Sequence, residues 1–259
     1  MKTIKYLSLA LTAVVGLTAC DNIDENDRYI EIPAAKVART VLLEEFTGQR
    51  CPNCPEGHKV AHDLVSSYGA NIIPVSIHCS RQSISESNTS VVGLAIPEGA
   101  ELYKMAGSPD LPSGVIDRKT EPLDRSQWPN TVRDEIETES FVTISLTPDV
   151  SDGNIHVSVA LKSSQAYTNT RLNVWLTEDN IVAYQINGRD NIEDYVHNHV
   201  LRAVASDVSG DAVQLTTSDE TVVEYTIPVK ERWNVDNVSV VVFVTDNTGV
   251  LQAAQAKVK

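Results

Sequence analysis

One segment, residues 41–62, constrains the fold of this chain more than any other. Its sequence, VLLEEFTGQRCPNCPEGHKVAH, passes from apolar, strand-like residues through a short turn into a Cys-x-x-Cys pair, Cys51 and Cys54. Pro55 follows, and the first turn of a helix tolerates proline because its N–H groups have no partner within the helix. The positive end of a helix dipole favours thiolate over thiol. The segment therefore predicts a strand, a turn and a helix that carries a reactive dithiol at its N-terminus.

The first 20 residues, MKTIKYLSLALTAVVGLTAC, combine two lysines, an apolar run and small residues before Cys20. This pattern predicts a secretory leader that is too short to act as a membrane span. The tetrapeptide LTAC resembles the lipobox of bacterial lipoproteins, which implies removal of residues 1–19 and acylation of Cys20. Several acyl chains on one residue would hold the protein stably to a membrane. A plain signal peptide with an incidental cysteine is the alternative.

Residues 20–37 begin with the acidic run DNIDEND after the cysteine and have no apolar periodicity. We expect them to form a flexible tether between the lipid and the folded part. The net charge of the chain is −14 and its lysines and arginines do not cluster, so nucleic acid is not an expected partner.

Three cysteines remain once Cys20 is assigned to the lipid, and these are too few for a disulfide scaffold. An exported protein with two of three thiols in one Cys-x-x-Cys is expected to use them for chemistry. The third, Cys79, ends a predicted strand and is interpreted as a small buried hydrophobic residue. A role as a third redox partner is the alternative.

Residues 38–139 alternate between strand and helix patterns. We predict strands at 38–46, 71–78 and 114–124, and helices at 54–68, 97–106 and 129–139. This order resembles the thioredoxin arrangement, an α/β fold, in which a cis-proline before the third strand faces the dithiol. Pro112 fits that place and Pro109 competes with it. Pro74, inside the second strand, suggests that this strand lies at a sheet edge.

Residues 140–259 lack a helical period and alternate between apolar and polar side chains. One example is Ile155, Val157, Val159 and Leu161, which are separated by more polar residues. Regular strands joined by polar turns predict an all-β antiparallel sandwich, which we expect to be immunoglobulin-like in architecture. The sequence thus predicts two domains, 38–139 and 140–259.

Three features together resemble one family. They are the lipobox, the segment LLEEFTGQRCPNCPEGH, and YVHNHVLRAVAS at residues 195–206. They are similar to the 28-kilodalton outer-membrane lipoproteins of Bacteroidetes, which pair a thioredoxin-like domain with a C-terminal β-domain. The resemblance implies an outer-membrane location, with the protein lipid-anchored and facing either the periplasm or the cell surface.

Thiol–disulfide exchange on exported proteins is the function that the dithiol favours. Cys51, as the more exposed thiol, would be the nucleophile, and Cys54 would resolve the mixed disulfide. The thioredoxin resemblance implies that Pro112 shapes the substrate groove and that Glu45 is a buried carboxylate that moves the proton of the resolving thiol. The alternatives are a solvated acid at Glu45 and a redox-inert disulfide between the two cysteines.

Two other classes of function remain as alternatives. Cys54, His58 and His62 follow one flank of the predicted helix and could hold a metal, but no second Cys-x-x-Cys supports this, so we predict no metal and no cofactor. A surface binding or adhesion module, with the thioredoxin-like domain as a scaffold, is the second alternative. His197 and His199 would then share one face of a strand, and the partners would be surface ligands.

Overall fold

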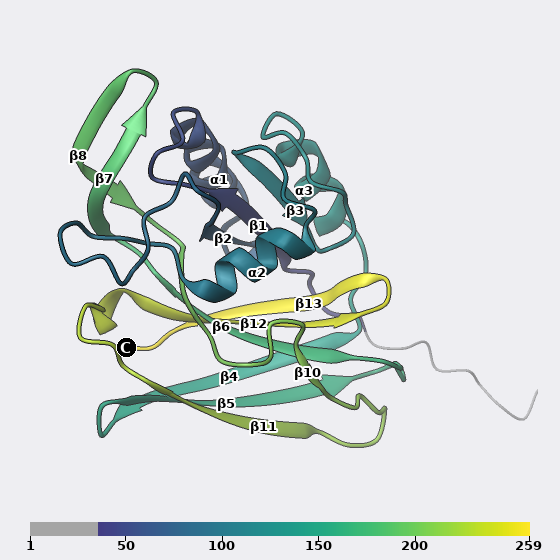
Figure 1. Cartoon of the computed structure of the whole chain (residues 1–259). Helices are drawn as coiled ribbons and strands as arrows, with labels where there is room; N and C mark the ends of the chain where they lie inside the picture. The colour runs from purple at the N-terminus through teal and green to yellow at the C-terminus, as the bar shows by residue number, and fades with distance from the viewer. Residues whose placement is uncertain (1–35) are drawn as a thin grey trace, which may run out of the picture. The chain divides into compact units, whose positions relative to one another are not determined.

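An eight-stranded sheet runs through the part of the protein that the structure describes, residues 36–259 of a computed structural model (Figure 1). The predicted leader, the lipidated Cys20 and nearly all of the tether lie outside the described residues. The strands follow the order β13-β12-β6-β9-β2-β1-β3, and β10 pairs with β6. Their bounds are β1 Val41–Thr47, β2 Ile72–His78, β3 Ser113–Ile116, β6 Arg171–Glu178, β9 Val200–Val204, β10 Asp211–Ala212, β12 Val238–Asp246 and β13 Gly249–Lys257.

The element order of the N-terminal half agrees with the sequence prediction. Helix α1 (Cys54–Tyr68) joins β1 to β2, which pairs with β1 in parallel; α2 (Pro97–Met105) leads to β3, which pairs with β1 antiparallel, and α3 (Trp128–Ile136) follows. A 3-10 turn, Gly69–Asn71, precedes β2, and a second, Val235–Asn237, precedes β12. The predicted bounds of α1 are confirmed, because its apolar positions and its proline fall where a helix needs them.

Helices cover both faces of the sheet at β1 and β2. On one face, residues of α1 and α3 such as Leu64 and Trp128 pack against Val41 and Leu43. On the other face, Leu102 of α2 belongs to a separate core that also contains residues of β1, β2, β6 and β12. Successive residues of β1 therefore enter different cores, as the alternation of side chains along a strand requires.

The position of Pro74 differs from the prediction. Strand β2 lies between β1 and β9 and is not an edge strand. However, β9 pairs with β2 only at Ser76, whose N–H donates to the carbonyl oxygen of His199 at 2.8 Å. The backbone nitrogen of Pro74 points to the same side as that of Ser76 but lies before the point where β9 begins. A proline is tolerated there because no partner strand needs its missing N–H.

The C-terminal half is all-β, as predicted. Strands β4 (Val142–Ser151), β5 (Asn154–Ser163) and β11 (Thr221–Pro228) form a three-stranded sheet in the order β11-β5-β4. The buried residues of β5 that the sequence singled out share a core with alternate residues of β6 and β12. This makes two facing layers, of which the second belongs to the large sheet (Figure 1). The boundary predicted at residues 139–140 stays a prediction, and the large sheet contains strands from both sides of it.

A buried ion pair ties the N-terminal strands to β13. Arg39 donates from Nη2 to Asp117 Oδ2 at 2.6 Å and to the carbonyl oxygen of Val250 at 2.6 Å. The other oxygen of Asp117 accepts from the N–H of Leu42 at 2.8 Å. Both charged side chains are at most 3% exposed, and the hydrogen bonds offset the cost of burying them. In residues 36–259, no helix has the length and apolarity needed to cross a membrane.

A two-stranded hairpin lies apart from both larger sheets. It consists of β7 (Ile181–Asn187) and β8 (Asp190–His197), which project beside α1 in Figure 1. The residues of β8 are mostly polar and exposed, so no apolar alternation marks this strand in the sequence.

Candidate functional site

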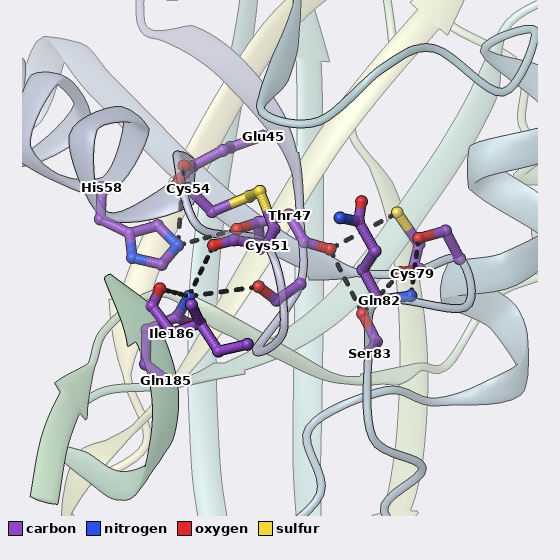
Figure 2. Close-up of a disulfide and its surroundings, with 12 residues drawn as sticks. Glu45, Thr47, Cys51, Cys54, His58, Cys79, Gln82, Ser83, Gln185 and Ile186 are labelled. Atoms are coloured by element: carbon purple, nitrogen blue, oxygen red, sulfur yellow. Dashed lines mark hydrogen bonds and ion pairs between the residues drawn. A yellow bond between two sulfur atoms is a disulfide. The ribbon is translucent and has the colours of Figure 1, made fainter. Parts of the chain in front are cut away.

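Cys51 and Cys54 form a disulfide at the N-terminus of α1 (Figure 2). Their Cα atoms are 5.4 Å apart, and Cys54 is the first residue of the helix. The N–H of Cys51 donates to the carbonyl oxygen of Gly48 at 3.0 Å, which closes the turn after β1. Strand, turn and helix thus place the two sulfurs as the sequence predicted.

The burial of this disulfide differs from the prediction. Cys51 was expected to be the more exposed thiol, but it is 1% exposed and Cys54 is 0% exposed. The β7–β8 hairpin lies over the loop that carries Cys51. The N–H of Ile186 donates to Gln49 at 2.8 Å, and the N–H of Gly188 donates to Pro52 at 2.9 Å. This hairpin joins the loop from more than a hundred residues away, so no local pattern could reveal the contact.

Gln185 fastens the hairpin to the same loop through its side chain. The two hydrogens of its Nε2 are shared among three carbonyl oxygens, those of Ile186 at 2.8 Å, Cys51 at 3.1 Å and Gly48 at 3.3 Å (Figure 2). The Gln185 side chain is fully buried, and its Oε1 has no hydrogen-bond partner within residues 36–259. Sequence analysis missed Gln185, because nothing in its neighbourhood along the chain distinguishes it from a surface glutamine.

Glu45 is buried in the middle of β1, at 0% exposure. Its Oε2 accepts a hydrogen bond of 3.0 Å from the hydroxyl of Ser76, whereas its Oε1 has no hydrogen-bond partner in the described part of the chain. Burial raises the pKa of the Glu45 carboxyl to about 8, and the Ser76 hydroxyl lowers that pKa by a smaller amount. The alternative interpretation of Glu45 as a solvated acid at the end of the strand is therefore wrong. With this raised pKa, the Glu45 carboxyl is protonated at neutral pH.

Pro112 has a cis peptide bond with Leu111, which decides between the two prolines that the sequence left open. Its ring lies close to the first turns of α1. A Cβ atom added to Gly57 would lie 3.1 Å from Pro112 Cβ and 2.8 Å from Glu45 Oε1. Gly57, which sequence analysis did not select, is therefore the point where Pro112, Glu45 and α1 meet.

His58 connects this region to the hairpin. Its Nε2 is 2.9 Å from the hydroxyl oxygen of Thr47, and its Nδ1 is 2.9 Å from the hydroxyl oxygen of Tyr195 on β8. Its Nε2 is also 3.8 Å from Glu45 Oε1. Burial lowers the pKa of His58 to about 3, with smaller contributions from His197 and His199. Since Glu45 is protonated and His58 is neutral at pH 7, their contact is not an ion pair.

Five of the six histidines of the chain line one small pocket of about 230 Å³. They are His58, His62, His78, His197 and His199. The rings of His78 and His197 meet edge to face with centroids 5.3 Å apart. Both nitrogens of His78 are buried and lack a hydrogen-bond partner among the described residues. Burial lowers the pKa of His78 well below its usual value and that of His197 to about 4, so these rings are neutral at pH 7.

His197 and His199 were predicted to share one face of a single strand, but no single strand contains both residues. Strand β8 ends at His197 and β9 begins at Val200, so Asn198 lies outside both. His199 has a positive φ of 57° and its Nδ1 is 3.3 Å from Asp179 Oδ1. Both histidines nevertheless line the pocket, from the opposite ends of this connection.

The side chains considered for the metal-binding alternative are not arranged as a set of metal ligands. Cys54 is bonded to Cys51, so it does not offer a thiolate to His58 and His62. In residues 36–259, no group of three or more histidine, cysteine or acidic side chains is arranged to hold a metal ion.

Cys79 is a free thiol, 2% exposed, whose sulfur lies 3.7 Å from the carbonyl oxygen of Thr47. Burial raises its pKa to about 12. A thiol that remains protonated at neutral pH does not attack disulfides, which supports its interpretation as a small buried hydrophobic residue.

The family model described as outer membrane protein Omp28 matches residues 100–259, more than half of the chain. The match contains Pro112 but not the segment with Cys51, Cys54 and Glu45. Among proteins with curated descriptions, none matches this chain.

The solved structures that are similar to this one include the following three. HBP35 of Porphyromonas gingivalis has 18% identity and a TM-score of 0.70, and the match covers 85% of this chain and 75% of that one. A protein from Agrobacterium tumefaciens has 13% identity and a TM-score of 0.51, with coverages of 87% and 97%. A domain of the outer membrane lipoprotein Omp28 from Porphyromonas gingivalis has 21% identity and a TM-score of 0.36, with coverages of 46% and 89%.

Proposed function

Because this chain belongs to the Omp28 family of outer membrane proteins, we propose that it is a lipoprotein, anchored through Cys20, that exchanges disulfides with the thiols of exported proteins. The family confirms the outer-membrane location that the sequence predicted. Membership of the family shows neither the lipid anchor at Cys20 nor the exchange reaction. Both are therefore part of the proposal.

The fold of residues 38–139 supports a thioredoxin-like domain. Strands β1 and β2 are parallel, helices cover both faces, and a cis-proline precedes the antiparallel strand β3. The similarity to HBP35, with a TM-score of 0.70, supports a common fold at 18% identity and says nothing about a common reaction. In this proposal residues 140–259 are a second, immunoglobulin-like domain whose strands extend the sheet of the first.

One observation carries the proposal: a disulfide begins α1, and the buried Glu45, with its raised pKa, lies against the first turns of that helix. In the exchange reaction, a thiolate of the substrate attacks the sulfur of Cys51. The bond between Cys51 and Cys54 breaks, and its electron pair leaves on the Cys54 sulfur. A second substrate thiolate then attacks the mixed disulfide and releases Cys51. The substrate gains a disulfide and the protein becomes a dithiol.

Glu45 supplies the proton that the leaving sulfur needs. With a pKa of about 8, it is protonated at pH 7 and can donate to the thiolate of Cys54. In the reverse reaction the same carboxylate accepts the proton. His58 and Tyr195 link Glu45 to the hairpin: His58 Nε2 lies 3.8 Å from Glu45 Oε1, and the hydroxyl oxygen of Tyr195 lies 2.9 Å from His58 Nδ1.

Because both sulfurs are buried, a substrate can reach Cys51 only after the β7–β8 hairpin moves away from the loop. The same burial favours a second candidate function, a surface binding module in which the disulfide only stabilises the start of α1. The two functions differ in whether the disulfide cycles under physiological redox conditions.

A redox titration of the protein comprising residues 21–259 tests the proposal. The fraction of alkylated Cys51 and Cys54 is measured across glutathione buffers. A midpoint between roughly −270 and −120 mV, the range of known exchange proteins, supports catalysis, and a midpoint below about −300 mV marks a structural disulfide and the binding module. Turnover of a disulfide-bonded substrate must be lost in Cys51→Ser and retained in Cys79→Ala, the matched control.

A further inference from the structure

Ser76 lies beside Glu45 in the sheet, and its position is fixed from two sides. Glu45 and Ser76 are register partners in the parallel pairing of β1 and β2, so their side chains point to the same face of the sheet. The backbone N–H of Ser76 donates to the carbonyl oxygen of His199 at 2.8 Å, where β9 meets β2. Both Glu45 and Ser76 are at most 3% exposed. The Ser76 hydroxyl is therefore held in one place next to the Glu45 carboxyl.

The two oxygens of this carboxyl have different surroundings. Oε2 accepts the hydrogen bond of the Ser76 hydroxyl at 3.0 Å, whereas Oε1 has no hydrogen-bond partner within residues 36–259. A Cβ atom added to Gly57 would lie 2.8 Å from Oε1, and Figure 2 shows the Glu45 side chain pointing toward the start of α1. With the Ser76 hydroxyl donating to Oε2, the proton of the acid is carried by Oε1.

Oε1 lies against the face of α1 that begins at Cys54. The buried residues of this helix are Cys54, Gly57, Ala61 and Leu64, and helical residues three or four positions apart share a face. Gly57 follows Cys54 by three positions, and a side chain there would occupy the place of the carboxyl. The proton-carrying oxygen therefore faces the same side of α1 as Cys54, whose sulfur leaves when the disulfide opens.

The Ser76 hydroxyl is also the group that stabilises the ionised form of Glu45. Burial raises the pKa of Glu45, the Ser76 hydroxyl lowers it, and no charged side chain of the described residues has a comparable effect. His58, 3.8 Å away, has a pKa lowered by burial to about 3, so it is neutral at pH 7. Burial raises the pKa of Tyr195 to about 12, so this phenol is uncharged as well.

The other ionisable groups that share a pocket with Glu45 are the remaining histidines described above and Lys59. Burial keeps His78 and His197 neutral at pH 7, as it does His199, whose pKa it also lowers. Lys59 is exposed and forms an ion pair with Asp63. After Glu45 loses its proton, the hydrogen bond from Ser76 is thus the contact that offsets the burial of the carboxylate.

We propose that Ser76 is a positioning residue of the exchange reaction, which keeps Oε1 of Glu45 directed at the start of α1 and stabilises the carboxylate that proton transfer leaves behind. This inference rests on the exchange function proposed above. When a substrate thiolate attacks Cys51, the electron pair of the broken bond moves to the Cys54 sulfur, and the proton moves from Glu45 Oε1 to that sulfur. In the reverse direction the carboxylate takes the proton back, and the Cys54 thiolate attacks the mixed disulfide. Ser76 itself transfers no proton.

Carbon-13 NMR of the Glu45 carboxyl tests the hydrogen bond. The protein comprising residues 21–259 is labelled at its glutamate carboxyls, and the signal of Glu45 is the one that Glu45→Gln lacks. Ser76→Ala should raise the pH at which this signal titrates by about one pH unit, as the loss of a hydrogen bond to a charged group predicts. Ser76→Thr, which keeps a hydroxyl, should titrate as the wild type does. Ser239→Ala, which removes an equally buried hydroxyl on β12, is the matched control.

The rate at which dithiothreitol reduces the disulfide at pH 7 tests the role in exchange. It is measured where the rate is proportional to the dithiothreitol concentration, so that hairpin opening alone does not limit it. Ser76→Ala should slow reduction by at least about threefold, because the acid is less well oriented and weaker. In a Glu45→Gln background the same substitution should change the rate by less than about 1.5-fold, because no carboxyl remains to be positioned.

Equal slowing by Ser76→Ala in both backgrounds would overturn the inference, because Ser76 would then not act through Glu45. An unchanged titration of Glu45 in Ser76→Ala would overturn it as well. Failure of the exchange function has a different signature: the disulfide of the wild type would stay closed across the glutathione buffers, while Ser76→Ala would still shift the titration of Glu45.

Discussion

The side-chain amide of Gln185 donates a hydrogen bond of 3.1 Å to the carbonyl oxygen of Cys51, a residue 134 positions earlier in the chain. The bond joins the β7–β8 hairpin to the turn that carries the disulfide. Two backbone hydrogen bonds, from Ile186 and Gly188, and one from the Gln49 side chain to the carbonyl oxygen of Tyr184 join the same two segments. Polar contacts therefore hold the hairpin against the loop that carries the disulfide.

Gln185→Ala should make the disulfide more accessible. Each net hydrogen bond contributes about 1 kcal/mol, and this side chain makes more than one, so opening of the hairpin should become roughly 5 to 30 times more frequent. The measurement is the rate at which dithiothreitol reduces the disulfide, followed by alkylation. Gln255→Ala, exposed on β13, is the control. Equal reduction rates in all three proteins would show that the hairpin does not limit access.

Glu45→Gln should change how stability depends on pH. The carboxyl has a pKa of about 8 in the folded protein and 4.5 as its ordinary value. Between these values the unfolded state releases the proton first, so the contribution of Glu45 is fully present below pH 4.5 and is lost as pH rises toward 8. The loss amounts to about 5 kcal/mol. Urea unfolding at pH 5, 6.5 and 8 should show this decline in the wild type and not in the variant.

Glu224→Gln, on the exposed side of β11, is the matched control for this experiment. It should retain the decline of the wild type. If Glu45→Gln retained it too, the carboxyl of Glu45 would not be protonated in the folded protein, and its role as proton donor to Cys54 would be wrong.

His197→Phe should make the protein less sensitive to acid. Burial lowers the pKa of His197 to about 4 from 6.5, so the unfolded state takes up a proton first as pH falls below 6.5. Stability from this residue is present above pH 6.5 and falls by about 2 kcal/mol on going to pH 5. Over this pH range Glu45 changes the free energy of unfolding in the opposite direction. The quantity to compare is therefore the difference in unfolding free energy between the His197→Phe variant and the wild type.

The measurement is the free energy of unfolding of both proteins at pH 6.5 and at pH 5. Phenylalanine is chosen because it keeps an aromatic ring against His78 and Tyr195. His156→Phe, on β5 in the facing sheet, should leave the acid sensitivity unchanged. If His197→Phe and His156→Phe changed the acid sensitivity equally, the buried histidines would not control the loss of stability at low pH.

Gly57→Ala should destabilise the protein although it lies inside a helix. Alanine normally stabilises a helix over glycine by about 0.5–1 kcal/mol. Here its Cβ would lie 2.8 Å from Glu45 Oε1 and 3.1 Å from Pro112 Cβ, so one of them must move. Overpacking of this kind costs about 1–3 kcal/mol, which outweighs the gain. Ser66→Ala, exposed on the same helix, is the control, and stabilisation by both variants would contradict the prediction.

The N-terminal elements were predictable because their signals are local. The bounds of α1 follow from its apolar spacing and from Pro55, and the alternation in β5 predicted a two-layered β region. Glu45 was selected only through the resemblance to thioredoxins, which keep a buried carboxylate at that place, and a solvated acid was left open. The cis bond at Pro112 followed from the resemblance to a known arrangement, which also left Pro109 open.

The sequence by itself determined the secondary structure around the dithiol, the all-β half and the family, since each depends on periodicity or on a contiguous motif. Only the tertiary structure decided what surrounds the disulfide. Gln185, Tyr195 and His197 reach Cys51 and His58 across more than 130 residues. Strand β8, which carries two of them, has the polar, exposed pattern of a loop. Contacts of this kind depend on how the sheet brings distant strands together, and a local pattern of side chains carries no record of that.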